Sequence, residues 1–228
     1  MTTPASPLPD VTRRDVGTTL ISEWRVDTPQ QQHIAAEALL SEWADLSARV
    51  RPTAFVQLSC FISTDGRVLL SYAQWRSDEA HISFARRHRP NMVNRIDQAV
   101  PGIQRPGLVR YRLHRSVSLN QASPAADSII VRQATTDQAD QAEPWANASA
   151  DALREKPPRG VAAAHFLLST DHTRAMLYAP ALADERDAVW PILDTRGVRL
   201  GPLQRYQLIG SVVGPGGTQT VQAPPTTM

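Results

Sequence analysis

The chain has 228 residues, enough for one large domain or for two domains of about 100 residues that each bury a core. Hydrophobic residues make up 42% and charged residues 20%, which is typical of a water-soluble globular protein and excludes a fibrous or disordered one. The formal net charge of +2 is small, and basic residues are spread among acidic ones, which argues against a nucleic-acid partner.

Cys60 is the only cysteine, so an internal disulfide and a thiolate metal cluster are excluded. No apolar run approaches the length of a membrane span, and the N-terminus lacks the charged and apolar regions of a signal peptide. We therefore expect a cytoplasmic protein with no membrane partner.

Residues 1–16 are rich in Pro, Thr and Ser and are predicted to form a disordered tail. Thr18–Val26 alternates between apolar and polar residues and predicts a first strand. Thr28 can then cap a helix, with Pro29 in its first turn and Gln31 completing a capping box. An apolar stripe with spacings of three and four residues predicts that this helix packs on a sheet through Ala35, Leu39, Trp43, Leu46 and Val50.

The next segment predicts a β-hairpin. Strands at Ala54–Ile62 and Arg67–Trp75 flank an Asp-Gly turn, in which Gly accepts a positive φ. The order that follows completes a ferredoxin-like unit of strand, helix, strand, strand, helix and strand. Its last elements are a helix that starts at Ser77 and is broken by Pro90, a further short helix at Asn91–Val100, and a strand at Gly107–Val117.

The same unit occurs twice in the chain. Ile62–Ala73 aligns with Leu168–Ala179, and Gly107–Val117 aligns with Pro202–Val212, each pair sharing several identical residues. The second copy is shorter between these two blocks, in the region of the second helix. We therefore predict an α+β fold with two tandem ferredoxin-like units that form an intrachain pseudo-dimer.

The predicted elements of the second copy start with a strand at Ser128–Ala134. A helix at Thr136–Leu153 follows, in which Pro144 marks either a kink or a late start, and strands follow at Val161–Ser169 and Arg174–Ala179. The predicted domains are a disordered tail at 1–16, a functional unit at 17–117, a linker at 118–127, a degenerate unit at 128–213 and a second disordered tail at 214–228.

One motif resembles a known family. The third strand ends in Tyr-x-x-Trp and runs into a helix that begins Ser-Asp-Glu-Ala, with a Phe in the next turn, as in the antibiotic biosynthesis monooxygenase family of the dimeric α/β barrels. The resemblance covers the first half well and the second half weakly, where Ala181 replaces the Trp. The matching residues of the first half are Tyr72, Trp75, Ser77, Glu79, Ala80 and Phe84.

The resemblance implies a barrel made of two sheets and a largely apolar cavity. Enzymes of the family include cofactor-free oxygenases that convert anthrones and phenols of polyketide pathways into quinones. Such a reaction needs a small aromatic substrate and dioxygen but no bound cofactor, and the sequence has neither a Gly-rich phosphate loop nor a metal-spaced cluster. We expect no cofactor, no metal, and an intrachain pseudo-dimer that can associate further.

Each candidate site residue has a structural alternative. Trp75 is either a core residue or the family's functional Trp, and Ser71 occupies the place where the family often has a hydrogen-bonding Asn. His81 and His88 either accept a phenolic proton near neutral pH or are solvated helix residues. We expect these four as catalytic residues. The expected substrate-binding residues are Tyr72, Trp24, Phe55, Phe84 and Arg110.

Two of these expected substrate-binding residues could instead have a purely structural role. Trp24 can be a core residue, and Arg110, repeated as Arg205 in the second copy, can pair with Glu23 rather than bind a phenolate. Two functions stay open: oxygenation of an aromatic polyketide intermediate, or a non-oxidative role as a cyclase or ligand-binding accessory protein. A haem-degrading relative is a minor third possibility, because the first strand lacks the Asn that this branch needs.

Overall fold

The computed structural model of the protein describes residues 8–119, 126, 128–182, 190–191 and 195–217. Its first half has the predicted element order. These elements are β1 (Thr18–Arg25), α1 (Pro29–Val50), β2 (Phe55–Ser63), β3 (Val68–Trp75), α2 (Asp78–Ala99) and β4 (Leu108–Ser118). The second half follows with β5 (Ser128–Thr136), α3 (Ala142–Glu155), β6 (Ala163–Ser169), β7 (Arg174–Ala181), β8 (Val198–Leu200) and β9 (Gln204–Val213).

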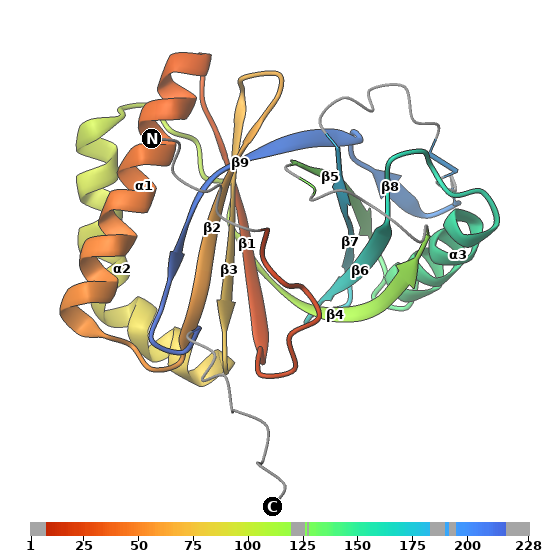
Figure 1. The fold of residues 1–228 in the computed structure, drawn as a ribbon, viewed down its shortest axis with the longest axis horizontal. Helices are drawn as coiled ribbons and strands as arrows, with labels where there is room; N and C mark the ends of the chain where they lie inside the picture. Colours follow the sequence, from red (N-terminus) through yellow and green to blue (C-terminus); the bar gives the residue numbers. More distant parts are fainter. Residues whose placement is uncertain (1–7, 120–125, 127, 183–189, 192–194, 218–228) are drawn as a thin grey trace, which may run out of the picture.

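Eight of the strands close into an antiparallel barrel. The order around it is β1, β3, β2, β9, β5, β7, β6 and β4, and β4 pairs back to β1, while β8 pairs beside β5. Helices α1 and α2 cover the barrel on one side and α3 covers it on the other (Figure 1). The fold is therefore α+β, as the sequence predicts.

The pairings of the two halves correspond strand for strand. In each half, the third strand lies between the first and second strands, and the fourth strand pairs with the first. That fourth strand also pairs with the second strand of the other half, as β4 does with β6 and β9 with β2. Each half thus supplies hydrogen bonds that the other half needs for a closed sheet.

The two predicted hairpin turns also share their hydrogen bonds. Asp65 Oδ1 accepts from Ser63 Oγ and from the backbone N–H two residues ahead. Asp171 Oδ1 likewise accepts from Ser169 Oγ and from Thr173 N, again two residues ahead. Gly66 in the first turn has a φ of +76°, and a Cβ there would lie 2.6 Å from Pro29 Cγ, so glycine is required.

The helix starts form largely as predicted. Thr28 Oγ1 accepts from Gln31 N at 3.1 Å, and Gln31 Oε1 in turn accepts from Asp27 N at 3.0 Å. At α2, Ser77 Oγ accepts from Ala80 N at 3.2 Å. In the second half the helix begins late, with Pro144 in its first turn, because β5 extends to Thr136 in order to pair with β8.

The predicted break at Pro90 is wrong, since α2 continues through it to Ala99 and includes the short helix expected at residues 91–100. Pro90 has no N–H to donate to the carbonyl of Arg86, a loss that costs about 3 kcal/mol in a helix interior. Packing of Met92 and Ile96, both buried beyond the proline, offsets this cost. Tertiary contacts therefore override the local signal.

The predicted tails are corrected where the structure describes them. Residues 8–16 contain no helix or strand, yet Val11 is buried against the barrel interior and Gln74 Nε2 donates to Asp10 O at 2.7 Å. Likewise, Gly214 N and Gly216 N donate to the backbone of β2. Backbone hydrogen bonds and burial thus order segments whose composition suggests disorder. Residues 1–7 and 218–228 lie outside the described residues.

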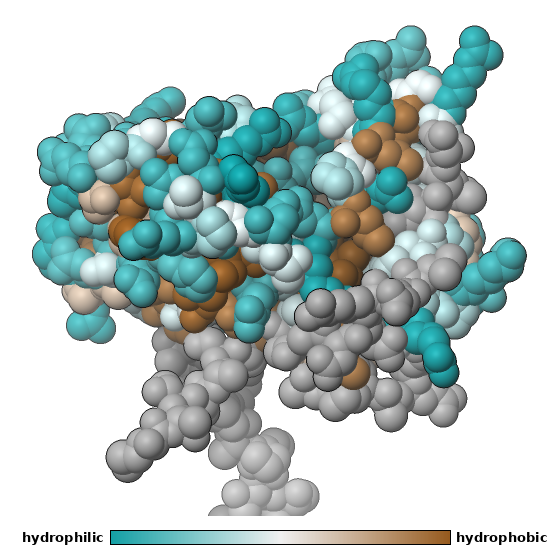
Figure 2. Space-filling view, turned by 90° about the horizontal axis from the view of Figure 1, so that it is seen from above, coloured by the Kyte–Doolittle hydropathy of each residue, from teal (hydrophilic) through white to brown (hydrophobic). Residues whose placement is uncertain are grey.

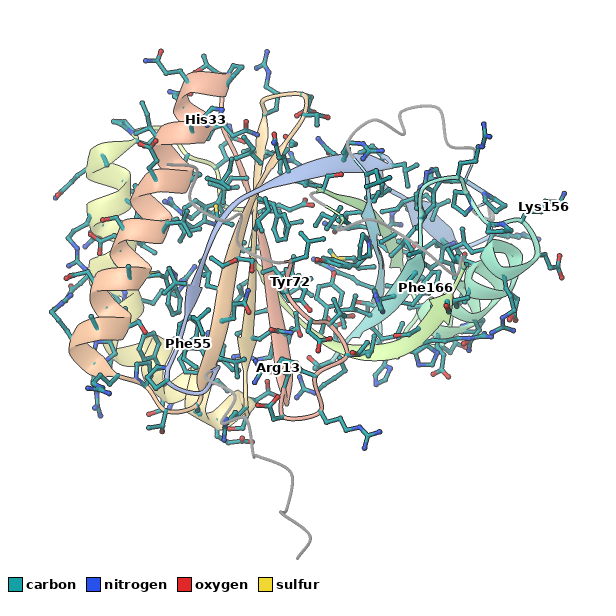
Figure 3. The ribbon with its side chains drawn as sticks, in the orientation of Figure 1. Arg13, His33, Phe55, Tyr72, Lys156 and Phe166 are labelled. Atoms are coloured by element: carbon teal, nitrogen blue, oxygen red, sulfur yellow. The ribbon has the colours of Figure 1, made fainter. Side chains whose placement is uncertain are left out.

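Three hydrophobic clusters form the core. One lies between the first sheet and α1 and α2, and includes Cys60 and Phe55; a second lies under α3 and includes Phe166. The third fills the barrel and contains all four tyrosines of the chain, Tyr72, Tyr111, Tyr178 and Tyr206. Figure 3 shows Tyr72 inside the barrel, Phe55 between β2 and α1, and Phe166 towards α3.

The surface is largely polar. Hydrophilic residues cover much of the visible helical face, with hydrophobic ones exposed between them (Figure 2). No helix among the described residues has both the length and the apolar character that crossing a membrane requires. The large exposed hydrophobic residues are spread over four elements and are Ile34, Val50, Ile82, Leu108, Leu113, Ile209 and Val213.

We predict that the two halves unfold together, because each closes the other's sheet. Phe166 is fully buried in the second half, and Phe166→Ala should lower the free energy of unfolding by about 3–5 kcal/mol. Tryptophan fluorescence during urea unfolding reports mainly the first half, which contains Trp24, Trp43 and Trp75. The expected result is a single transition that moves to lower urea. Two transitions, with the fluorescence midpoint unmoved, would contradict the prediction.

Candidate functional site

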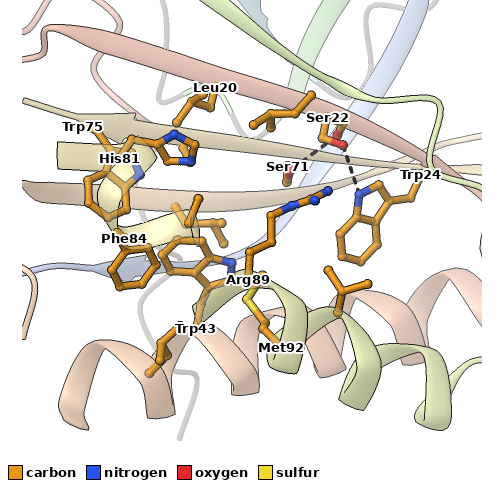
Figure 4. Close-up of a pocket in the computed structure, with 16 residues that line it drawn as sticks. Leu20, Ser22, Trp24, Trp43, Ser71, Trp75, His81, Phe84, Arg89 and Met92 are labelled. Atoms are coloured by element: carbon orange, nitrogen blue, oxygen red, sulfur yellow. Dashed lines mark hydrogen bonds between the residues drawn. The ribbon is translucent and has the colours of Figure 1, made fainter. Parts of the chain in front are cut away.

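An apolar cavity of about 70 Å³ lies between the first sheet and the helices α1 and α2 (Figure 4). Side chains alternate across a strand, so the even positions of β1 and the odd positions of β3 share the helix-facing side. The residues that line it are Leu20, Ser22, Trp24, Trp43, Leu46, Leu58, Ser71, Ala73, Trp75, His81, Phe84, Ala85, Arg89, Met92, Val93 and Leu108.

Aromatic rings form much of the wall. The Trp75 ring centroid lies 4.9 Å from that of Phe84 and 6.3 Å from that of Trp43. Trp24 Nε1 donates to Ser22 Oγ at 3.1 Å, whereas the buried Nε1 of Trp75 has no hydrogen-bond partner among the residues that the structure describes. A buried N–H without an acceptor is costly, so Trp75 presents an unused donor to a ligand that can accept from it.

His81 is held in one tautomer. Its Nδ1 lies 2.9 Å from an Nη of Arg110, and because arginine only donates, Nδ1 accepts and Nε2 carries the proton. Burial, followed by the positive charge of Arg110, lowers the pKa of His81 from its ordinary 6.5 to about 4. His81 is therefore neutral at pH 7 and can donate from Nε2, while its other ring nitrogen faces Arg110.

Arg110 is held in turn by Asp78 at the first residue of α2. Arg110 Nε lies 3.3 Å from Asp78 Oδ1, and Arg112 binds the other oxygen of Asp78 at 2.5 Å. These positive partners help to lower the pKa of Asp78, against the opposing effect of its partial burial. Arg110 thus acts behind His81 and does not line the cavity. Its ion-pair partner is Asp78 and not Glu23, the structural alternative considered above, and Tyr206 donates to Glu23 at 3.1 Å.

Arg89 is the one charged residue among the described lining residues apart from the titratable His81. Its side chain extends from α2 towards the strands (Figure 4). As a residue it is exposed to solvent, and it has no ion pair within the described residues. The cavity therefore combines an apolar wall with a cation that is free to bind an anionic group.

The structure brings five of the nine expected site residues to this cavity: Trp24, Ser71, Trp75, His81 and Phe84. Ser71 Oγ makes only a long contact of 3.4 Å to Ser22 O. Arg110 stands behind His81, as described above, and His88 packs its ring 4.9 Å from Phe84, outside the lining.

Phe55 and Tyr72 are the remaining two. Phe55 is a core residue that packs against Trp43 and Trp75. Tyr72 points to the opposite face of β3, into the barrel, where its ring lies 5.6 Å from that of Tyr178. Burial raises the pKa of Tyr72, which makes its hydroxyl a poor acid.

Three polar or aromatic lining residues are not among the expected site residues: Trp43, Ser22 and Arg89. The helical stripe places Trp43 in the core but does not reveal a gap in its packing. No sequence motif singles out Ser22, and Arg89 belongs to a run of charged residues. The only sequence signal for Ser22 is that it lies two residues before Trp24 and therefore on the same face of the strand.

The second half contains no matching arrangement among its described residues. Ala181 stands where the first half has Trp75, and Arg205, the counterpart of Arg110, donates to Ser128 Oγ and to Leu182 O. The shortened second helix predicted here falls largely on residues 183–189 and 192–194, which lie outside the described residues. Nor do the described residues of the chain contain three or more His, Cys, Asp or Glu placed to hold a metal.

No family model matches this sequence, and no curated protein shows a significant match. The fold is similar to that of solved structures. An anthrone oxidase-like protein is 14% identical, with a TM-score of 0.63 over 92% of this chain and 98% of the other. A protein of Fusobacterium nucleatum subsp. nucleatum that carries the name of a monooxygenase is 9% identical, with a TM-score of 0.53 over 90% and 98%. At these identities the comparisons show the fold alone.

We predict that Arg110→Met raises the pKa of His81, because it removes a neighbouring positive charge while burial remains. The pKa should stay below the ordinary 6.5. Histidine ring signals in an NMR pH titration give the value, and His81→Gln identifies the signal. Arg112→Met is the matched control, because it also removes an arginine that pairs with Asp78, but Arg112 makes no contact with His81. An unchanged pKa in Arg110→Met would refute the assigned contact.

We further predict that His81 makes the protein less stable in acid. Between pH 6.5 and about 4 the unfolded chain binds a proton at His81 that the folded chain does not. The free energy of unfolding should therefore fall as the pH decreases through this range, and His81 contributes at most about 1.4 kcal/mol per pH unit to this fall. Above pH 7, His81 should contribute no pH dependence. Urea unfolding of His81→Gln should show a shallower dependence, and identical slopes in both proteins would contradict it.

Proposed function

We propose that this protein is a cofactor-independent monooxygenase that oxidises an aromatic phenol or anthrone-type polyketide intermediate, in the cytoplasm. The observation that carries the proposal is the unpartnered indole Nε1 of Trp75 in an apolar cavity whose wall is aromatic. A flat aromatic ligand fits such a wall, and its oxygen can accept the hydrogen bond that Trp75 lacks. The similarity in fold to an anthrone oxidase-like protein supports the reaction class.

The proposed chemistry needs only substrate and dioxygen. The anion of an anthrone gives an electron to O₂, and the radicals combine to form a C–O bond at the methylene carbon. The peroxide takes a proton, and loss of the remaining C–H proton breaks the O–O bond and releases water. One oxygen atom becomes the new carbonyl of the quinone and the other leaves in water, so the substrate supplies all four electrons.

The residues of the cavity act on the anion. Trp75 Nε1 and His81 Nε2 donate to the oxygen that bears the negative charge, and Arg89 adds a positive charge. Asp78 and Arg110 position His81 so that its proton faces away from Arg110. The apolar wall limits water, which strengthens these interactions and protects a reactive intermediate.

Binding requires α2 to move. Ligand pockets usually measure about 300–1,000 Å³, whereas this cavity is about 70 Å³. Helix α2 has three buried residues against seven on α1, and it contains Pro90 next to Arg89. An outward shift of the segment between Phe84 and Met92, with rotation of Arg89, enlarges the cavity at a small loss of buried area.

We also propose that the chain is a tandem duplication in which two ferredoxin-like units, residues 17–117 and 128–213, form a pseudo-dimer. The matching strand pairings and the equivalent turns at Asp65 and Asp171 support this. The first unit is the functional copy. Its support is that Trp75 and the Arg110–His81 contact have no counterpart in the described part of the second unit.

A non-oxidative role is the second candidate: a polyketide cyclase or a ligand-binding accessory protein that uses the same cavity. The observation that favours it is the low pKa of His81, since the cavity then offers no base near neutral pH to generate the reactive anion. Ligand binding without oxygen consumption would favour this alternative.

We predict that the protein consumes oxygen with an anthrone or a naphthol and that Trp75→Phe slows this by at least tenfold, because it removes the indole donor. Loss of an oxyanion donor costs about 10²–10³ in rate in other enzymes. The matched control is Trp145→Phe, an equally buried indole in the second half. Oxygen uptake and melting temperature are measured for both. Equal rate losses in the two variants, or loss of stability alone in Trp75→Phe, would refute the assigned role.

A further inference from the structure

The unused hydrogen-bonding groups of the cavity are donors. Trp75 Nε1 is buried without a hydrogen-bond partner among the described residues, and the indole of Trp43 lines the same cavity. His81 Nε2 carries a proton because Nδ1 accepts from Arg110, and the guanidinium of Arg89 has only donors. Four side chains therefore offer N–H groups to whatever occupies the cavity (Figure 4).

The acceptors of the cavity are few. Ser22 Oγ donates to Gly107 O and accepts from Trp24 Nε1, while Ser71 Oγ donates over a long 3.4 Å to Ser22 O and keeps its own lone pairs. Nδ1 of His81 faces Arg110. No carboxylate lines the cavity in the part of the chain that the structure describes. A ligand that brings an O–H donor finds at most the spare lone pairs of two serines.

The charges around the cavity are also predominantly positive. The acidic groups nearby are each paired with arginines, Asp78 with Arg110 and Arg112, and Asp97 with Arg105. Arg105, the partner of Asp97, stacks over the Trp24 ring at 4.4 Å. The lining residues from α1 and β3 carry no charge. The titratable and charged groups that face the cavity or pack behind it are His81, His88 and Arg89 on α2, Arg110 on β4, and Arg105 before β4.

We infer that this cavity takes its aromatic ligand as a preformed oxyanion, so that its substrates are acidic phenols or enols that ionise in solution before they bind. The inference rests on the proposed function insofar as it calls the ligand a substrate. The preference for an anion rests on the N–H donors alone. A phenolate accepts from two or three N–H groups and meets the charge of Arg89. A neutral phenol leaves these donors poorly satisfied and brings one more, which costs affinity.

The proton leaves the ligand outside the cavity. His81 cannot take it readily, because its free nitrogen already carries a hydrogen and its other nitrogen faces Arg110. Affinity should therefore follow the ionisation of the ligand and not that of a residue in the protein. Among phenols of similar size, the more acidic one should bind more tightly at pH 7.

The test uses 4-nitrophenol and its methyl ether 4-nitroanisole, which do not react with dioxygen, in calorimetric titrations of the intact protein. For 4-nitrophenol, the dissociation constant should fall about tenfold from one pH unit below the ligand's own pKa to one unit above it, in line with the fraction ionised. The ether should bind more weakly, without this dependence. Tighter binding of the neutral phenol, or equal binding of the ether at high pH, would overturn the inference.

Arg89→Gln should weaken nitrophenolate binding at least tenfold and leave nitroanisole unchanged, since it removes the charge and leaves a shorter, neutral polar side chain. Arg87→Gln is the control, because Arg87 is exposed on the same helix and does not line the cavity. Equal losses in both variants would overturn the assignment to Arg89. These binding measurements do not depend on turnover. Anion-selective binding without oxygen uptake would contradict the proposed function alone. Oxygen uptake without anion-selective binding would contradict this inference alone.

Discussion

Closure of the barrel is the constraint on which the rest of the structure depends. Strand β4 ends the sheet of the first half and pairs with β6, while β9 ends the second sheet and pairs with β2. Closure gives every barrel strand an inner and an outer face. The inner face buries the tyrosines, and the outer face carries Trp24, Ser71 and Trp75 towards the helices. The cavity exists because α2 covers that outer face with fewer buried residues than α1 does.

The contact between Arg110 and His81 decides what kind of chemistry the cavity can perform. Without Arg110, a histidine beside an aromatic wall would be a natural general base. Because the Arg110 guanidinium donates to Nδ1, the ring is a neutral hydrogen-bond donor. Arg205, at the same strand position in the second half, instead donates to Ser128 Oγ and to the backbone carbonyl of Leu182. One arginine, repeated in both halves, thus has two different uses. In the first half this use depends on α2, which supplies His81 and Asp78; the corresponding region of the second half lies largely outside the described residues.

Much of the fold could be predicted from the sequence because its signals are local and repeated. The Asp-Gly hairpin, the cap at Thr28 and the alternation of β1 each depend on neighbouring residues. The continuation of α2 past Pro90 could not be predicted, because burial of Met92 and Ile96 outweighs a local penalty. Strand β8 is three residues long and exists only through its pairing with β5. No local sequence pattern predicts such a short strand.

The site was harder to predict for a related reason. Strand alternation placed Trp75 and Ser71 on one face, and that part holds. Tyr72 belongs to the family motif, yet it lies on the other face of β3, inside the barrel, as strand alternation requires. The partner of Arg110 depends on which side chain α2 brings to β4, a contact between residues 29 positions apart that composition and spacing do not encode.

A crystal structure of the protein with a bound, non-oxidisable phenolate tests the central claim most directly. The account predicts one ligand per chain, between the first sheet and α2, with its oxygen within hydrogen-bonding distance of Trp75 Nε1 and His81 Nε2. It also predicts that Arg89 and the segment from Phe84 to Met92 move outward relative to the structure described above. A ligand inside the barrel or under α3, with the cavity at Trp75 unchanged, would contradict it.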